Sequence, residues 1–253
     1  MSASPSSFAS LDGLIAHAAR HDAPRIEPVR LAGHRYWSKR PEVLSLRWRW
    51  QKGDPARSFA RERRIHHDLL ARGAPVPPIL AEAEGYMVLP DSGPTLEALM
   101  RGAVPRGERL RAFEAAGAAL AGMHGAGLVH GRPLPRDLCW NGERITFLDF
   151  EGGARAGRAS MGRKALDLVL ALHGIYALSP RPVPEADAFC NGYRGADDGL
   201  WRDARRRVRR WRWIDTLTRP LQYYEARFKP HRTYKELLAL PWTFAQFTRE
   251  DGG

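Results

Sequence analysis

The chain has 253 residues, 43% of them hydrophobic, and a formal net charge of +12. That length is enough to bury the core of one large domain or of two smaller lobes. No apolar run reaches the length of a membrane span, and the opening MSASPSSFAS lacks the basic and apolar regions of a secretory signal. The two cysteines, Cys139 and Cys190, form neither a metal-binding spacing nor a disulfide framework. These features predict a cytoplasmic protein.

The first 90 residues predict a small antiparallel sheet accompanied by helical segments. The Ser/Pro-rich start, residues 1–7, is predicted to be disordered. Two strands are expected to form a hairpin through Ala32-Gly33, and a second hairpin is expected near residue 84. In chain order, the predicted elements are a helix over 8–20, strands over 26–31 and 34–39, a helix over 57–72, and strands over 79–82 and 85–89.

The remainder of the chain predicts mainly helices. Six segments are predicted to be helices, and apolar residues recur with helical spacing in 107–126 and 200–217. These segments are 95–100, 107–126, 164–176, 185–193, 200–217 and 234–240.

The most informative stretch, residues 124–153, interrupts these helices. After the long helix, a loop opens with His130-Gly131-Arg132, and Asp137 follows Arg132 by five residues. A two-stranded hairpin is expected next, and its second strand, residues 145–148, ends at Asp149. An acidic residue is therefore expected directly after a short strand.

This arrangement resembles the core of the protein-kinase-like superfamily. In protein kinases, an H-R-D-x-x-x-x-N loop precedes a strand that ends in a metal-binding Asp-Phe-Gly. Here the second motif is Asp149-Phe150-Glu151, which is similar to that of sugar, choline and aminoglycoside phosphotransferases. The loop at His130 resembles the HGD loop of small-molecule and lipopolysaccharide-core kinases. No G-x-G-x-x-G loop precedes Lys39, as in the lipopolysaccharide-kinase branch.

The resemblance covers roughly residues 26–176 and implies an α+β, bilobal fold. A sheet-containing N-terminal lobe is expected over residues 1–90. A mainly helical C-terminal lobe, with the catalytic and metal-binding loops, is expected over residues 91–253.

The resemblance also implies a nucleotide-binding half of the site, with ATP as the nucleotide. Lys39, in a Y-x-x-K-R pattern, corresponds to the lysine that holds the α and β phosphates. Glu62, in an F-x-R-E pattern, corresponds to the glutamate that holds this lysine in position. Val88 and Leu89 would lie at the strand leading to the hinge, where the backbone contacts adenine. The alternatives are an exposed strand-end lysine and a surface glutamate.

Metal binding and the acceptor are implied by the loop residues. Asp149 would bind Mg²⁺, and Asp137 stands where the family has a metal-binding asparagine; a carboxylate is also a suitable oxygen donor. His130 corresponds to a histidine that braces the metal-binding loop, with a catalytic role as the alternative. Asp167 corresponds to a buried acid that anchors backbone amides of the catalytic loop.

Arg132 is the main departure, because it stands where the family carries its catalytic aspartate and cannot act as a base at neutral pH. Either Asp137 supplies the base, or Arg132 stabilises the transferring phosphate, or the protein binds nucleotide without turnover. The first interpretation is a kinase-like phosphotransferase that uses ATP and Mg²⁺ on a sugar or glycolipid hydroxyl. The alternative is a pseudokinase that acts as a nucleotide-binding or membrane-surface module.

The positive charge indicates an anionic partner, although only five of the 40 basic residues are lysine and 35 are arginine. RNA binding would rest on charge alone, because no nucleic-acid motif is present, so nucleic acid is not an expected partner. The helix over 200–217 combines an apolar stripe with arginines between 202 and 212. It is interpreted either as a helix with its stripe in the core or as a peripheral contact with the anionic inner membrane.

Overall fold

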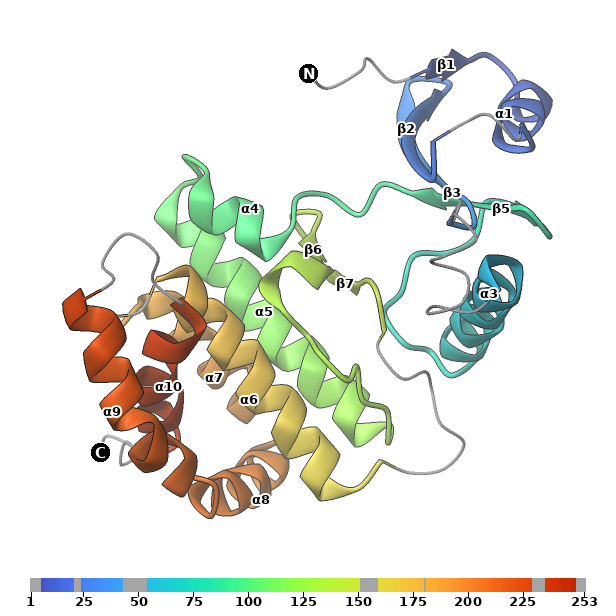
Figure 1. The fold of residues 1–253 in the computed structure, drawn as a ribbon. Coiled ribbons are helices and arrows are strands. Elements are labelled where there is room, and N and C mark those ends of the chain that lie inside the picture. Colours follow the sequence, from blue (N-terminus) through green and yellow to red (C-terminus); the bar gives the residue numbers. More distant parts are fainter. Residues whose placement is uncertain are drawn as a thin grey trace. The chain divides into compact units, whose positions relative to one another are not determined.

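The structure is a computed structural model that describes residues 6–20, 24–42, 54–150, 159–179, 181–228 and 235–248. The chain divides into two compact units, Met1–Ser92 and Gly93–Gly253 (Figure 1). The first unit is built around a sheet and the second is mostly helical, so the chain belongs to the α+β class, as predicted. Residues 1–5 of the predicted disordered start lie outside the described residues. For Ser6 and Ser7 the prediction is wrong, because they belong to strand β1.

The first unit contains a five-stranded sheet in the order β1-β2-β3-β5-β4. β1 pairs with β2 in parallel, and every other neighbouring pair of this sheet is antiparallel. The strands are β1 Ser6–Phe8, β2 Ile26–Leu31, β3 His34–Lys39, β4 Ala81–Ala83 and β5 Tyr86–Pro90.

The β2–β3 hairpin has the bounds that the sequence predicts. Its two loop residues, Ala32 and Gly33, have φ angles of 49° and 82°. Two consecutive positive φ values are the signature of a type I′ turn, whose twist matches that of the strands it joins. The tight turn fixes the register, which pairs Ile26 with Lys39 at the open end of the hairpin.

Helix α1, Leu11–Ala18, begins later than the predicted helix over 8–20. Phe8 lies in β1, and Ser10 caps the helix by accepting a hydrogen bond from the backbone N–H of Gly13 at 3.2 Å. Ser at the N-cap position satisfies an N–H that has no partner within the helix. The helix then packs its apolar side on the sheet in a core that contains Leu14, Ala18, Val29, Tyr86 and Val88.

Helix α3, Pro55–Ala71, begins two residues before the predicted helix over 57–72. Asp54 accepts a hydrogen bond from the N–H of Ala56 at 3.0 Å, and Pro55 occupies the first helical position. Proline suits that position, because its φ is already helical and its missing N–H is not needed there. The cap therefore explains the earlier start.

The second unit consists mainly of helices, with a short hairpin beside α4 and α5 (Figure 1). Helix α5 packs along α7, and α6 packs against α8 and α10. The helices are α4 Leu96–Arg101, α5 Arg106–Gly125, α6 Met161–Leu178, α7 Pro184–Ala196, α8 Asp198–Arg209, α9 Trp213–Phe228 and α10 Lys235–Gln246. The 3₁₀ helix Pro135–Asp137 leads into the hairpin of β6, Leu138–Trp140, and β7, Ile145–Phe147.

Two glycines allow α5 and α7 to approach closely. A Cβ atom on Gly117 would overlap the carbonyl oxygen of Phe189, and one on Gly192 would overlap that of Glu114. Any side chain at either position would force the helix backbones apart. This contact is part of the packing that supports the loop after α5.

The single helix predicted over 200–217 is wrong. Helix α8 ends at Arg209 and α9 begins at Trp213. Trp201, Ala204 and Val208 of the predicted apolar stripe are buried, which confirms that this part of the stripe belongs to the core. Within the described part of the chain, no helix is long and apolar enough to cross a membrane.

Candidate functional site

In the first unit, Lys39 and Glu62 form an ion pair, as the sequence predicts. Lys39 ends β3, and the side chains of a strand alternate between its two faces. Because Tyr36 packs with the α1 core, Lys39 projects from the opposite face, where it meets Glu62 of α3. The side chains are 15% and 40% exposed, so the ammonium group is held in place at a site that solvent still reaches.

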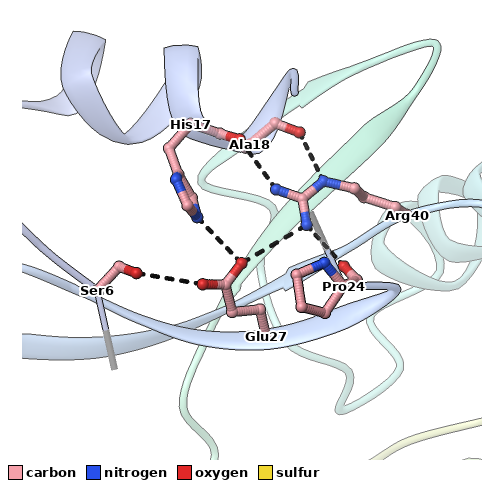
Figure 2. A network of polar contacts seen from close by, with 6 residues as sticks. All are labelled: Ser6, His17, Ala18, Pro24, Glu27 and Arg40. Atoms are coloured by element: carbon pink, nitrogen blue, oxygen red, sulfur yellow. Dashed lines mark hydrogen bonds and ion pairs between the residues drawn. The ribbon is translucent and has the colours of Figure 1, made fainter. Parts of the chain in front are cut away.

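The residue after Lys39 is held on the α1 side of the sheet (Figure 2). Arg40 is buried and donates hydrogen bonds to the carbonyl oxygens of Ala18, Pro24 and His17 at 2.8, 2.7 and 3.0 Å. These include carbonyl groups of the last turn of α1, which have no partners within the helix. Arg40 therefore ties the end of β3 to α1.

Glu27 of β2 completes this network (Figure 2). Its carboxylate lies 3.7 Å from the guanidinium of Arg40, 3.0 Å from His17 Nε2, and accepts a hydrogen bond from Ser6 at 3.2 Å. The charge of Arg40 is thus compensated on the α1 side. Lys39, on the other face, keeps its contact with Glu62.

Val88 and Leu89 lie in β5, on opposite faces of the sheet. Val88 packs in the α1 core, and its carbonyl oxygen accepts a hydrogen bond from Leu80 N–H at 2.9 Å. Leu89 pairs with Trp37, two residues from Lys39 along β3 and on the same face. The adenine contact proposed for this pair stays a prediction, and Leu89 alone has its side chain on the Lys39 face.

In the second unit, His130 links the loop after α5 to the segment after β7. Its Nε2 lies 2.7 Å from the carbonyl oxygen of Leu148, and its Nδ1 lies 3.3 Å from the N–H of Arg132. A carbonyl accepts and an N–H donates, so both contacts are compatible with one tautomer, in which Nε2 carries the proton. The aromatic ring of Phe150 packs on His130 at a centroid distance of 4.5 Å. His130 therefore braces both neighbours of Asp149, as the resemblance implies.

Asp167 of α6 anchors the loop that begins at His130, as predicted. It is 1% exposed, and its carboxylate accepts hydrogen bonds from the N–H groups of His130 at 2.7 Å and Gly131 at 2.9 Å. Gly131 has a φ of 99°, a conformation that a side chain would strain. The backbone turn of the loop is thus specified by a glycine and by a buried carboxylate.

Two residues that the sequence did not single out complete this network. His124 of α5 lies with Nδ1 2.7 Å from the hydroxyl of Tyr193, and with Nε2 3.3 Å from Asp167. Burial lowers the pKa of His124 and raises the pKa of Tyr193, so both groups are neutral near pH 7. Tyr193 then donates to His124, and His124 donates to Asp167. Position 124 lies on the buried side of α5 by helical spacing, but no sequence signal identifies its partners on α6 and α7.

Asp137 and Asp149 lie at the same end of the β6–β7 hairpin. The pairing of Leu138 with Phe147 is extended by a hydrogen bond of 2.8 Å from Leu148 N–H to the carbonyl oxygen of Asp137. Asp149, the residue after Leu148, is exposed, whereas Asp137 is 6% exposed. Asp149 also has a φ of 50°, in the left-handed region. Strained backbone of this kind clusters at functional sites, although aspartate tolerates it better than most residues.

Asp137 and Asp149 are too few to form a magnesium site from protein ligands alone, but they suit a site that substrate phosphates and water complete. Among the described residues, no group of three or more His, Cys, Asp and Glu side chains could hold a metal ion. Mg²⁺ in phosphoryl-transfer sites is bound by one or two carboxylates, while substrate phosphates and water complete its coordination. Asp137 and Asp149 therefore suit a metal ion that arrives with a nucleotide.

Arg132 follows Gly131 and is half-buried. Its backbone is fixed through its N–H contact with His130 Nδ1. A guanidinium at this point in the loop brings a permanent positive charge and planar donors that suit phosphate. The loop thus carries Arg132 and, five residues later, Asp137, whose Oδ1 lies 3.7 Å from Nε of Arg136.

No family model matches the chain. A Haemophilus influenzae protein, described as uncharacterized, is 35% identical to it over 133 residues. The match covers 52% of this chain and 55% of that protein, so the chain spans about half the length of the relative.

Proposed function

We propose that this protein is an ATP-dependent phosphotransferase of the protein-kinase-like superfamily, related to the lipopolysaccharide-core kinase branch. Its acceptor would be a hydroxyl group of a sugar or glycolipid. The observation that carries the proposal is the brace between the loop and the segment at Asp149. Asp167 binds the amides of His130 and Gly131, while His130 binds the carbonyl group of Leu148. A loop fixed in this way supports a site that depends on positioning, which is how phosphoryl transfer is catalysed.

Each unit carries residues to which we assign a role toward the nucleotide. Lys39 binds the α and β phosphates of ATP, and Glu62 keeps its ammonium group in position. Asp149 and Asp137 would hold Mg²⁺, which would supply positive charge against the phosphates. Leu89 and the backbone near it contribute to the adenine contact.

The acceptor role falls to the loop. Asp137 is the only acidic residue between His130 and the start of β6, so it would accept the proton of the acceptor hydroxyl if Asp149 alone held Mg²⁺. Arg132 stabilises the negative charge of the transferring phosphoryl group through its guanidinium. A loose transition state needs little help from a base, so a site with one carboxylate and one guanidinium is sufficient.

Arg132 also favours a second candidate function, a pseudokinase that binds nucleotide without transferring phosphate. A permanent cation next to the γ-phosphate would hold ATP in the ground state as well as in the transition state. Binding both states equally gives affinity without rate. In either case we propose that the protein works in the cytoplasm.

The experiment is a phosphate-transfer assay with γ-labelled ATP, Mg²⁺ and a panel of sugar and glycolipid acceptors. Wild type is compared with Asp149→Asn and Lys39→Met, and with Asp198→Asn as a control at an exposed carboxylate of α8, 48% exposed. The proposal predicts transfer or slow hydrolysis that is lost in the first two variants and kept in the control. ATP binding without turnover in wild type would identify the pseudokinase. ATP turnover that survives in Asp149→Asn would refute both the phosphotransferase and the pseudokinase proposal.

A further inference from the structure

Helix α9 presents its polar side to the protein. Gln222 is 8% exposed, and its amide donates hydrogen bonds to Thr218 Oγ1 at 2.9 Å and to Asp215 Oδ1 at 3.2 Å. The Asp215 side chain is only 14% exposed. Residues 215, 218 and 222 are three and four apart, so they share one face of the helix. A helix of a water-soluble domain normally turns its apolar face inward, and α9 does the reverse.

The opposite face carries large apolar side chains that face solvent. Trp213, Leu217, Leu221 and Tyr224 are 61%, 71%, 53% and 47% exposed. Their spacing of four, four and three residues places them along one stripe, which we call the α9 stripe. Tyr223, 70% exposed, lies beside it. Four large apolar residues in one contiguous exposed stripe mark an interaction surface.

Arginines border the α9 stripe. Arg212, Arg219 and Arg227 are exposed. At 100° per residue Arg219 and Arg227 fall on one flank of the stripe, and Arg212 directly precedes the helix. The end of α8 and the link that follows add exposed Arg206, Arg209 and Arg210. The occupant of this surface must therefore be apolar at its centre and negatively charged at its rim.

We propose that the α9 stripe inserts into the interfacial layer of an anionic phospholipid bilayer, with the flanking arginines on headgroup phosphates. Tryptophan, tyrosine and leucine on one side of a helix and arginine on its flank are the composition of an interfacial helix. A second copy of this chain fits less well, because pairing two such faces would bring arginines of like charge together in a protein of net charge +12. No described helix spans a membrane, so the contact is peripheral.

This surface differs from the one that the sequence suggested. The apolar residues Trp201, Ala204 and Val208 of α8 are buried and unavailable to lipid. We therefore assign the membrane contact to α9 instead of α8. That the apolar side of α9 faces solvent could be recognised only from the structure, which shows which side of the helix is packed. The inference does not depend on phosphoryl transfer and would hold for a pseudokinase as well.

The test is sedimentation of the full chain with vesicles of phosphatidylcholine alone or with phosphatidylglycerol. Wild type is expected to bind the anionic vesicles and to lose affinity as salt rises. In the variant Leu217→Ser/Leu221→Ser, affinity is expected to fall on the order of tenfold for each leucine. Leu11→Ser, at an exposed leucine of α1, is the matched control and is expected to bind as wild type does.

The arginine flank is tested with Arg212→Gln/Arg219→Gln. This variant is expected to lose roughly fivefold affinity per arginine for anionic vesicles. Arg101→Gln is the control, because Arg101 is 70% exposed and pairs with Glu97 four residues away, as Arg219 does with Asp215. A loss of affinity per arginine that is the same in the double variant and in Arg101→Gln would overturn the assignment of the flank to headgroups.

A spectroscopic measurement keeps the proposal testable if the leucine variant does not fold. Brominated acyl chains are expected to quench part of the tryptophan fluorescence of wild type, and Trp213→Phe is expected to remove that part. Absence of quenching at saturating anionic vesicles would overturn the proposal. So would a wild-type dimer that Leu217→Ser/Leu221→Ser converts to a monomer, because the stripe would then be covered by a second copy.

Discussion

Replacing Asp167 by asparagine tests the anchor of the His130 loop with almost no change in volume. The wild-type carboxylate offers Oδ2 to His130 N–H at 2.7 Å and to His124 at 3.3 Å, and offers Oδ1 to Gly131 N–H at 2.9 Å. Asparagine has a single side-chain oxygen. Its NH₂ group must therefore face at least one of these donors.

The better orientation keeps the oxygen on His130 and turns the NH₂ group toward Gly131. One backbone N–H then loses its acceptor, which costs about 1–3 kcal/mol. The remaining bonds lose their charge assistance, roughly another 1 kcal/mol, because hydrogen bonds to charged groups are about twice as strong. The two losses together are about 2–4 kcal/mol. The smaller desolvation cost of a neutral amide offsets part of this loss, so we expect the free energy of unfolding to fall by about 1–3 kcal/mol.

Urea unfolding followed by near-ultraviolet circular dichroism measures this change. With a slope of about 2 kcal/mol per molar urea, the midpoint should fall by roughly 0.5–1.5 M. Amide hydrogen exchange should also accelerate at His130 and Gly131. Asp198→Asn, at an exposed carboxylate with surface ion pairs, should change stability by less than about 1 kcal/mol. A midpoint for Asp167→Asn equal to that of wild type, with unchanged exchange at both amides, would refute the anchor.

Three further predictions concern packing, pH and the ion pair. Gly117→Ala should lower the free energy of unfolding by more than about 3 kcal/mol, because its Cβ would overlap the carbonyl oxygen of Phe189; an unchanged melting temperature would contradict the close approach of α5 and α7. Burial lowers the pKa of His66, His124 and His173 below the usual 6.5. Just below pH 6.5, therefore, the unfolded chain takes up protons at these histidines and the folded chain does not. The free energy of unfolding should be greatest above about pH 6.5 and should fall toward pH 5, by up to about 1.4 kcal/mol per pH unit for each histidine. Urea midpoints at pH 7.5 and 5.5 check this, and a flat profile would contradict it. Glu62→Gln should change stability by less than about 1 kcal/mol, because the pair is partly exposed, yet weaken ATP binding; calorimetric titration with an unchanged Kd would remove Glu62 from the nucleotide site.

The elements that the sequence predicted best are those specified by local chemistry. The β2–β3 hairpin follows from alternation and from the Ala32-Gly33 turn, and α4 follows from its cap, since Thr95 accepts a hydrogen bond from Ala98 N–H at 3.1 Å. The contact of Lys39 with Glu62 was implied by the resemblance. Local signals and motif spacing were sufficient in these cases.

The elements that were missed depend on distant partners. β1 is three residues long and exists because it pairs with β2, which no local pattern reveals. The break between α8 and α9 was hidden because apolar residues continue at helical spacing through Trp211 and Ile214. Tyr193 joined the network at Asp167 only through the packing of α5, α6 and α7. The packing of Val88 in the α1 core likewise could not be predicted without the register of the sheet.

The most direct test of the central claim is the melting temperature of the full chain with ATP, with and without Mg²⁺, for wild type and Asp149→Ala. A ligand that binds the folded state raises its stability by mass action, by about 2.7 kcal/mol at a hundred times its Kd. The account predicts a rise in melting temperature that requires Mg²⁺ in wild type and is absent in the variant. No rise at millimolar ATP, or an equal rise in Asp149→Ala, would contradict it.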